Sequence, residues 1–407
     1  MTNINLLEKA ESYLNRLCFK IPDRRVGSKG NQMSSEFIAQ VLSSFDFQIE
    51  YPEFSCMDWT HGDVHLDAGG EPFDAYIGPY SLGCDLNLPF MVASNLDELG
   101  EVEAANKILL LNGDITKEQL MPKKFPFYNP ARHKKIINLL EKKRPAAIIA
   151  STTRNPELAG GMYPFPLIED GDFDIPSVYM KEEECNRLLR KTKRAISLKM
   201  TAERIPSKGY NVIARKGGDL GRKVVICAHL DAKDGTPGAL DNGTGVVVLL
   251  LLAELLKDYS GRLGVEIVAL NGEDHYSAQG QIEYINGIGD RFNDILLAIN
   301  LDAPGYRQDI TAFSLYECPE KIADTIREVL SSRPDVVEGE QWYQGDHSIF
   351  IQNQVPAMAI TSDKFMWLST HITHTSKDRP ELVDYDKLVD IGLALREFVL
   401  ELNLNLD

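Results

Sequence analysis

The sequence predicts an α/β fold of three layers, in which helices cover both faces of a mostly parallel, mixed central sheet. From residue 205 onward, short apolar runs alternate with longer segments of helical periodicity. Strands separated by helices of this length pair in parallel and are buried on both faces. The chain has 407 residues, more than one hydrophobic core ordinarily supports. Over 55–204 its helical periodicity gives way to aromatic residues, prolines and short β-like runs. We therefore expect a smaller α+β insertion domain within the α/β unit.

The elements of the α/β unit are placed by their hydrophobic periodicity. Continuous aliphatic runs predict strands, and apolar residues at spacings of three and four predict helices. The expected strands are 223–228, 263–270, 295–301 and 356–361, and the expected helices are 6–17, 34–45, 243–259, 277–286, 319–331 and 382–402. We assign residues 1–54 and 205–407 to this domain.

Residues 55–204 are assigned to the inserted domain. Aromatic residues, prolines and short β-like runs replace the helical periodicity there. Strands are expected at 106–114, 146–152 and 175–180, with an amphipathic helix at 130–144. The Lys and Arg residues of this helix are interpreted as a solvated face.

Composition excludes several classes of function. The net charge of −17 argues against a nucleic-acid or anionic-membrane partner, since both need a basic surface. The longest apolar run, 245–256, is too short to cross a bilayer. Six scattered cysteines and an N-terminus without a secretory pattern indicate reduced thiols and a cytoplasmic location.

Acidic residues and histidines follow each predicted strand of the second half. Strand 223–228 ends in His229-Leu230-Asp231, and the glycine-rich loop after it contains Asp241. Strand 263–270 leads to Glu273 and Asp274, and strand 295–301 to Asp302. The loop after strand 356–361 carries His371 and His374. Working residues of parallel sheets gather beyond the carboxyl ends of the strands, so we expect these side chains to meet.

Taken singly, each of these residues has an ordinary explanation. Asp241 could cap the helix that follows it, and Glu273 and Asp274 could be solvated surface acids. Their joint placement favours a cation site, because buried adjacent carboxylates need a neutralising charge. Imidazole and carboxylate ligands without cysteine suit zinc, cobalt or manganese in an open catalytic site. Two histidines and three aspartates exceed what one tetrahedral zinc needs, which favours two divalent ions and leaves Glu273 as a base.

Four segments, CAHLDAKDGTPGALDNGTGVVVLLLLAELL, LNGEDHYSAQG, NLDAPG and HTSKD, resemble metallopeptidase family twenty-eight in the same order. The resemblance covers 205–400 well and the first 54 residues loosely. It implies the zinc-exopeptidase fold and a peptide substrate. The inserted region more weakly resembles the protease-associated domain, which in relatives can shape substrate access or the contacts of a homodimer.

The resemblance also implies roles for individual residues. His229 and Asp302 would hold one zinc, Asp274 and His374 the other, and Asp241 would bridge them. Glu273 matches the general base, and Asp231 the acid that steadies a ligand. The segment Gly345–Phe350 (GDHSIF) resembles a stretch near the substrate pocket or is a packed loop; its His347 is a tentative substrate contact, together with Tyr306 and Arg307.

The chain departs from the family pattern at three positions. Asp274 stands where the family usually has the longer Glu. Thr373 replaces the Tyr that often stabilises the oxyanion, for which Tyr306, Tyr343 and His347 are candidates. His371 competes with His374 as the last ligand, and we prefer His374 because the HTxxD pattern begins there.

An aminopeptidase is the expected activity, with Glu273 as general base and a water between the metal ions as nucleophile. A carboxypeptidase or dipeptidase is the first alternative, because Arg307 and Lys377 could bind a substrate carboxylate. A glutaminyl-cyclase-like acyl transferase and a metal-binding homologue without activity are the further alternatives.

Overall fold

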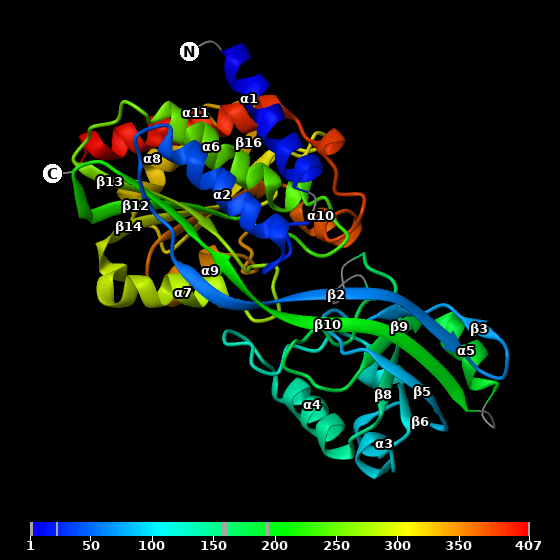
Figure 1. Ribbon diagram of the computed structural model, residues 1–407. Helices are drawn as coiled ribbons and strands as arrows, with labels where there is room; N and C mark the ends of the chain where they lie inside the picture. The colour runs from blue at the N-terminus through cyan, green and yellow to red at the C-terminus, as the bar shows by residue number, and fades with distance from the viewer. Residues whose placement is uncertain (1–2, 22, 156–160, 192–194, 406–407) are drawn as a thin grey trace. The chain divides into compact units, whose positions relative to one another are not determined.

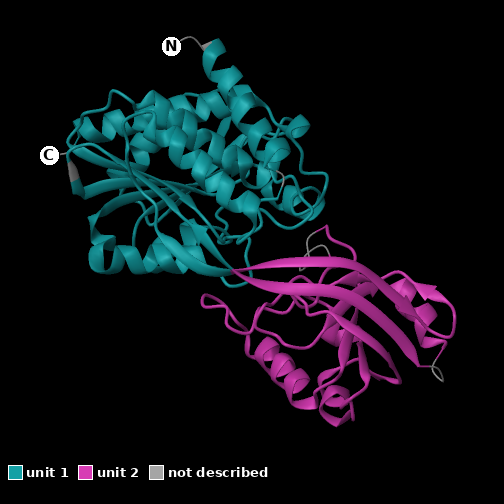
Figure 2. Cartoon of the chain, viewed as in Figure 1, with its two compact units in different colours: residues 1–56, 207–407 teal, residues 57–206 magenta. Residues whose placement is uncertain are grey.

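The structure is a computed structural model that describes residues 3–21, 23–155, 161–191 and 195–405. The chain divides into two compact units, coloured separately in Figure 2. Unit 1 comprises residues 1–56 and 207–407, and unit 2 residues 57–206. The expected domain boundaries, 54/55 and 204/205, lie two residues from these divisions.

Unit 1 is built on an eight-stranded sheet in the order β1-β11-β13-β12-β14-β17-β15-β16. The four central strands, β13, β12, β14 and β17, run parallel to one another. The strands β11 and β15 pair antiparallel with β13 and β17 respectively, so the sheet is mixed. The strand bounds are β1 Gln48–Glu50, β11 Val212–Lys216, β12 Asp219–His229, β13 Leu263–Leu270, β14 Ile295–Leu301, β15 Thr311–Tyr316, β16 Val336–Glu338 and β17 Ala357–Ser362.

Helices cover both faces of this sheet, as Figure 1 shows for α1, α2, α6 and α11 on one side and α7 and α9 on the other. Alternate residues of β12 point to opposite faces: Val224 and Ile226 join the core beneath the first group, Val225 and Cys227 the core beneath the second. This two-sided burial confirms the predicted three-layer fold. The helix bounds are α1 Asn3–Asn15, α2 Lys29–Ser43, α6 Gly245–Leu255, α7 Gln279–Ile288, α8 Glu320–Ser331, α9 His347–Gln352, α10 Phe365–His371 and α11 Tyr385–Leu404.

The helix α6 is apolar all round (GVVVLLLLAEL), and nearly all of it is buried between the sheet and its neighbouring helices. Its start lies two residues beyond the expected Gly243, after the short helix η3, Ala239–Thr244. The side chain of Asn242 accepts the N–H of Gly245 at 3.1 Å. Asn242 rather than Asp241 therefore accepts an N–H group at the start of this helix, which leaves the Asp241 carboxylate for another use.

Unit 2 has two sheets. An antiparallel sheet, β3-β2-β10-β5, shares one apolar core with a five-stranded sheet, β4-β9-β8-β7-β6, whose last four strands are parallel. A second core lies between the five-stranded sheet and α4. The bounds are β2 Glu53–Asp67, β3 Pro72–Phe73, β4 Tyr76–Ile77, β5 Cys84–Leu88, β6 Phe90–Ala93, β7 Ile108–Leu111, β8 Ala147–Thr152, β9 Ser177–Lys181, β10 Ile196–Tyr210, α3 Leu96–Glu101, α4 Ala131–Lys143 and α5 Glu182–Leu189.

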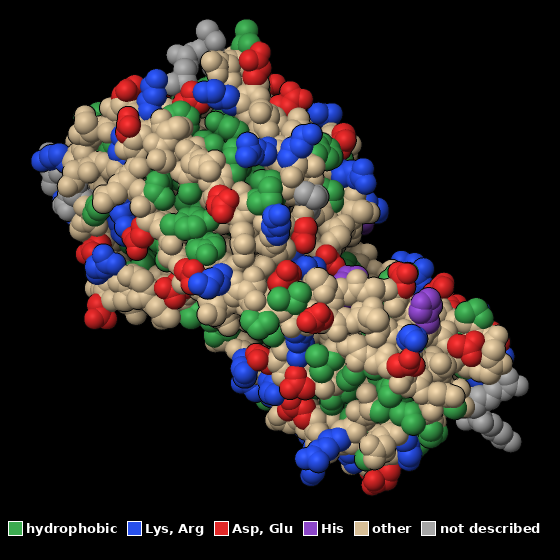
Figure 3. All heavy atoms as spheres, in the orientation of Figure 1, with side chains coloured by type: hydrophobic (Ala, Val, Ile, Leu, Met, Phe, Trp, Pro, Cys, Tyr) green, Lys and Arg blue, Asp and Glu red, His purple; other side chains and the backbone are tan. Residues whose placement is uncertain are grey.

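The surface carries charges of both signs. Acidic and basic side chains are interspersed on the face drawn in Figure 3. None of the described helices has the length and apolar character needed to span a bilayer.

Candidate metal centre

Three parallel strands of unit 1 deliver the predicted site residues. His229 is the last residue of β12, Glu273 and Asp274 follow β13, and Asp302 follows β14 directly. Because β13, β12 and β14 are neighbours, their carboxyl ends meet at one edge of the sheet. Asp241 reaches this edge from η3, and His374 from the loop after α10.

The carboxylate of Asp241 lies between the two histidines. Its Oδ1 atom is 3.1 Å from Nε2 of His229, and its Oδ2 atom is 3.0 Å from Nε2 of His374. The Oδ1 atom of Asp274 is also 3.0 Å from Nε2 of His374. Asp302 Oδ1 and Glu273 Oε2 lie farther out, 3.9 and 4.0 Å from Nε2 of His229.

These side chains fit a cation. Ligand atoms of His229, Asp241 and Asp274 all lie within 4.8 Å of one another. Three buried atoms of this group have no hydrogen-bond partner in the described part of the chain. They are the two ring nitrogens of His229 and the Oδ2 atom of Asp274. Buried polar atoms in a folded protein are normally paired, so these unpaired nitrogen and oxygen atoms are suited to hold a cation.

The electrostatics of the cluster also favour a cation. The carboxylates of Asp231 and Asp241 raise the pKa of His229 well above its usual value, although its burial opposes this. The charge of Asp274 and a bond to Asp241 likewise raise the pKa of His374 against the effect of burial. The carboxylates of the cluster thus favour positive charge between them, which a metal ion would also supply.

Glu273 is the predicted base and differs from the other carboxylates in two respects. Burial, reinforced by the charges of Asp274 and Asp302, raises the pKa of Glu273 well above its usual value, although His229 lowers it. Its side chain is 23% exposed, against 11% for Asp241, 8% for Asp302 and 4% for Asp274. It is therefore the carboxylate of this group most open to an incoming molecule.

Asp231 supports the site from behind. It is 1% exposed, and its oxygens accept the N–H groups of Gly272 at 2.7 Å and of Asp274 at 3.0 Å. Its Oδ1 atom lies 3.7 Å from Nδ1 of His229. One carboxylate thus fixes the loop that carries Glu273 and also faces the histidine ring. The supporting role of Asp231 stays a prediction.

Three further buried charged residues, which lie near the centre, were not assigned a role from the sequence. Arg24 lies in the polar turn between the first two helices and donates to several carbonyl groups of the loop after β12. Asp378, within the HTSKD segment, accepts the amides of Leu240 and Asp241. Asp346 is fully buried, accepts the side chain of Gln281 at 2.7 Å, and has its pKa raised to about 6, chiefly by burial.

The tentative substrate residues form hydrogen bonds with other residues of the chain. His347 is buried, with Nε2 2.7 Å from the carbonyl of Trp342 and Nδ1 3.3 Å from Asn300, and burial lowers its pKa to about 4. The hydroxyl of Tyr306 donates to Gln308, and the guanidinium of Arg307 donates to the carbonyl of Val383. Their role in substrate binding stays a prediction.

The structure also places the residues around His374, the expected last ligand. The ring of His371 is exposed and stacks on Trp367 at 4.6 Å. The buried Thr373 precedes His374, whose φ of 59° lies in the left-handed region. A non-glycine residue in that region costs about 1–3 kcal/mol and is found disproportionately at functional sites. Tyr343 is 61% exposed and packs edge-on against Tyr316.

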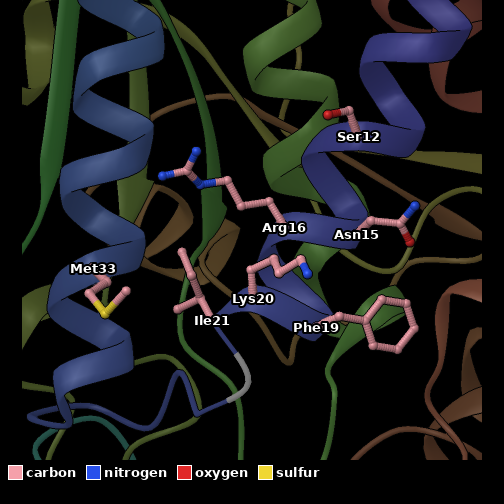
Figure 4. Close-up of a pocket in the computed structure, with 7 residues that line it drawn as sticks. All are labelled: Ser12, Asn15, Arg16, Phe19, Lys20, Ile21 and Met33. Carbon is pink, nitrogen blue, oxygen red and sulfur yellow. The ribbon is translucent and has the colours of Figure 1, made fainter.

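A separate hollow of about 500 Å³ opens beside α1 and α2. Figure 4 shows its lining, which includes Arg16, Lys20, Phe19 and Met33. None of the predicted site residues lines it.

A three-layer α/β unit with histidines and carboxylates at the ends of its parallel strands defines a metal-binding protein of the α/β class. Residues 211–399, most of unit 1, match the model of peptidase family M28. The match does not extend to unit 2, so its likeness to the protease-associated domain stays a prediction.

Known proteins show the same relationship. The chain is 26% identical over 293 residues to a probable lipoprotein aminopeptidase, LpqL, of Mycobacterium tuberculosis, covering 70% of this chain and 56% of that protein. It is 24% identical over 387 residues to a probable leucine aminopeptidase 2 of Aspergillus fumigatus, covering 87% and 71%. The chain therefore spans little more than half the length of the mycobacterial relative.

Solved structures establish the likeness of the fold. An aminopeptidase from Aneurinibacillus sp. strain AM-1 aligns with a TM-score of 0.75 at 18% identity, covering 97% of this chain and 93% of the other. The zinc aminopeptidase BSAP from Bacillus subtilis aligns with a TM-score of 0.74 at 19% identity, covering 97% and 94%.

Proposed function

We propose that the protein is a zinc-dependent aminopeptidase that binds two metal ions through His229, Asp241, Asp274, Asp302 and His374. The observation that carries the proposal is the position of Asp241, whose two oxygens face two different histidines at 3.0–3.1 Å. A carboxylate in this position is suited to bridge two cations. Relatives named as aminopeptidases support the same activity.

Zinc ions, when bound, would polarise the substrate carbonyl and make a water molecule more acidic. Glu273 takes a proton from that water, because it is the most exposed carboxylate of the group and is not one of the proposed metal ligands. It then returns the proton to the leaving amine. Asp231 holds Glu273 in place through the amides on either side of it, those of Gly272 and Asp274.

The charge of the site favours an aminopeptidase over a carboxypeptidase. In the described part of the chain, no Lys or Arg forms an ion pair with Asp231, Asp241, Glu273, Asp274 or Asp302. Arg307, the cation suggested for a substrate carboxylate, instead donates to Val383 and lines a hollow with Glu8 and Glu11. A carboxypeptidase needs a cation for the substrate carboxylate, and none is paired with these acids among the described residues.

The test compares matched peptides with the zinc-loaded protein. One peptide of each pair has a free amino terminus and the other is N-acetylated. We expect release of the N-terminal residue from the free peptides alone. Cleavage of the acetylated peptides, or release of the C-terminal residue, would contradict the proposal. The cytoplasmic location and a homodimer stay predictions, which fractionation and sedimentation would check.

A further inference from the structure

The loop between β12 and α6 carries both Asp231 and Asp241, and it is held by a buried cation on one side. Arg24 is 2% exposed, and its guanidinium donates to the carbonyls of Leu230 at 3.1 Å, Pro237 at 2.9 Å and Gly238 at 2.7 Å. A fourth bond reaches Leu17. Three of these acceptors bracket the loop, so one side chain from near the N-terminus fixes its beginning and its end.

A buried anion holds the same loop through its amides. Asp378 is fully buried, and its Oδ1 and Oδ2 atoms accept the N–H groups of Leu240 at 2.7 Å and Asp241 at 3.0 Å. Asp378 follows His374 by four residues, and its own N–H donates to Thr375 at 3.2 Å. Asp378 thereby ties the backbone of Asp241 to the loop of His374.

The two charges have complementary tasks. A buried loop must find partners for its carbonyls and its amides, and here a guanidinium serves the carbonyls while a carboxylate serves the amides. The amide of Asp241 is only a few bonds from its carboxylate. Fixing that amide therefore limits where the two oxygens can lie, and these are the oxygens that face His229 and His374.

We propose that Arg24 and Asp378 are positioning residues that set the bridging geometry of Asp241 and so determine how tightly the second metal ion binds. This inference rests on the proposed two-metal function. Neither side chain contacts a ligand atom; each acts through the backbone of the Asp241 loop. Residues that orient metal ligands typically change affinity about 10–100-fold when replaced.

Two variants test the proposal. Asp378→Asn keeps the size of the side chain but places an amide group against a backbone N–H in one of the two bonds. Arg24→Lys keeps the charge but loses the fork that reaches several carbonyls at once. Zinc affinity is measured by competition with a chromophoric chelator. We expect each variant to bind its weaker zinc equivalent at least about tenfold less tightly than the wild type.

Unit 2 offers a matched control. Asp170 is 2% exposed, and its oxygens accept the amides of Lys123 and Asp172, both at 2.7 Å. Asp170→Asn therefore removes the same kind of buried carboxylate and should lower stability, while every residue of unit 1 keeps its identity. We expect a lower Tm for the metal-free control and unchanged affinity for both zinc equivalents.

The outcomes separate this inference from the proposed function. A wild-type protein that binds no second zinc overturns the two-metal function and the inference with it. A wild type with two equivalents, whose affinities survive both Asp378→Asn and Arg24→Lys, overturns the inference alone. An equal loss of affinity in Asp170→Asn would overturn it too, because the effect would then be one of general stability. If Asp378→Asn does not fold, the zinc affinity of Arg24→Lys alone tests the inference.

Discussion

The Oδ2 atom of Asp231 accepts the backbone N–H of Asp274 at 3.0 Å, so an acid that follows one strand positions a site residue that follows the next. Its Oδ1 atom accepts the N–H of Gly272 at 2.7 Å. The residue between them is Glu273. This arrangement makes the geometry of both the proposed base and a proposed ligand dependent on one buried carboxylate.

Asp231→Asn is expected to weaken zinc binding about 10–100-fold, because one acceptor is replaced by a donor that faces a backbone N–H. Equilibrium dialysis against buffered zinc measures the effect. Asp234→Asn in the same loop is a suitable control, since the Asp234 side chain is 42% exposed and pairs with Arg25 at the surface. Equal affinities for Asp231→Asn and the wild type would show that Asp231 does not position the site.

Glu273→Gln is expected to keep bound zinc and lose turnover. The amide has nearly the same shape as the carboxylate but cannot accept the proton, and general base catalysis contributes about 10²–10⁴-fold. The measurement is kcat on a free-amine peptide, with zinc content determined on the same sample. Normal turnover with normal zinc content would rule out Glu273 as the base.

His374 and His371 can be separated by paired replacements. His374→Ala removes a ring 3.0 Å from both Asp241 and Asp274, so the protein should hold at most one tightly bound zinc. His371→Ala removes an exposed ring stacked on Trp367 and should leave zinc content unchanged, with stability within about 0.5 kcal/mol of wild type. The opposite pattern of zinc content would make His371 the ligand.

His347 should contribute to the pH dependence of stability. Burial lowers its pKa to about 4 in the folded protein, against about 6.5 for an unfolded chain. Between these values the unfolded state binds more protons, so folding weakens as the pH falls, by up to about 1.4 kcal/mol per pH unit. Urea unfolding of wild type and His347→Gln at several pH values between 4 and 6.5 should show a steeper decline for wild type. Parallel profiles would contradict a buried neutral His347.

The sequence was sufficient for the elements that carry the centre. The expected strands 263–270 and 295–301 coincide with β13 and β14. Both strands are buried on both faces of the sheet, so their sequences are near-continuous aliphatic runs that can be recognised. The site residues could be found for the same reason, since they follow those runs directly. The rule that parallel strands end at one edge predicted that these side chains would meet. The central place of Asp241 was expected from the family resemblance and not from that rule.

Other features have no local signal. The strands β2 and β10 were not predicted, because most of their residues are partly or fully exposed and do not alternate regularly between polar and apolar. The bonds from Asp378 to the Asp241 loop join residues 137 and 138 positions apart, and those from Arg24 join residues 206–214 positions apart. Both act on backbone groups, which are the same at every residue and leave no pattern in the sequence.

The proposed bridging role of Asp241 is tested most directly by counting zinc. The wild-type protein and Asp241→Ala are loaded with zinc, freed of loosely bound metal by gel filtration, and measured by elemental analysis. We predict two zinc ions per wild-type chain and at most one in Asp241→Ala, because the carboxylate that faces both His229 and His374 is gone. A wild-type chain without two bound zinc ions, or an Asp241→Ala chain that keeps two, would contradict the account.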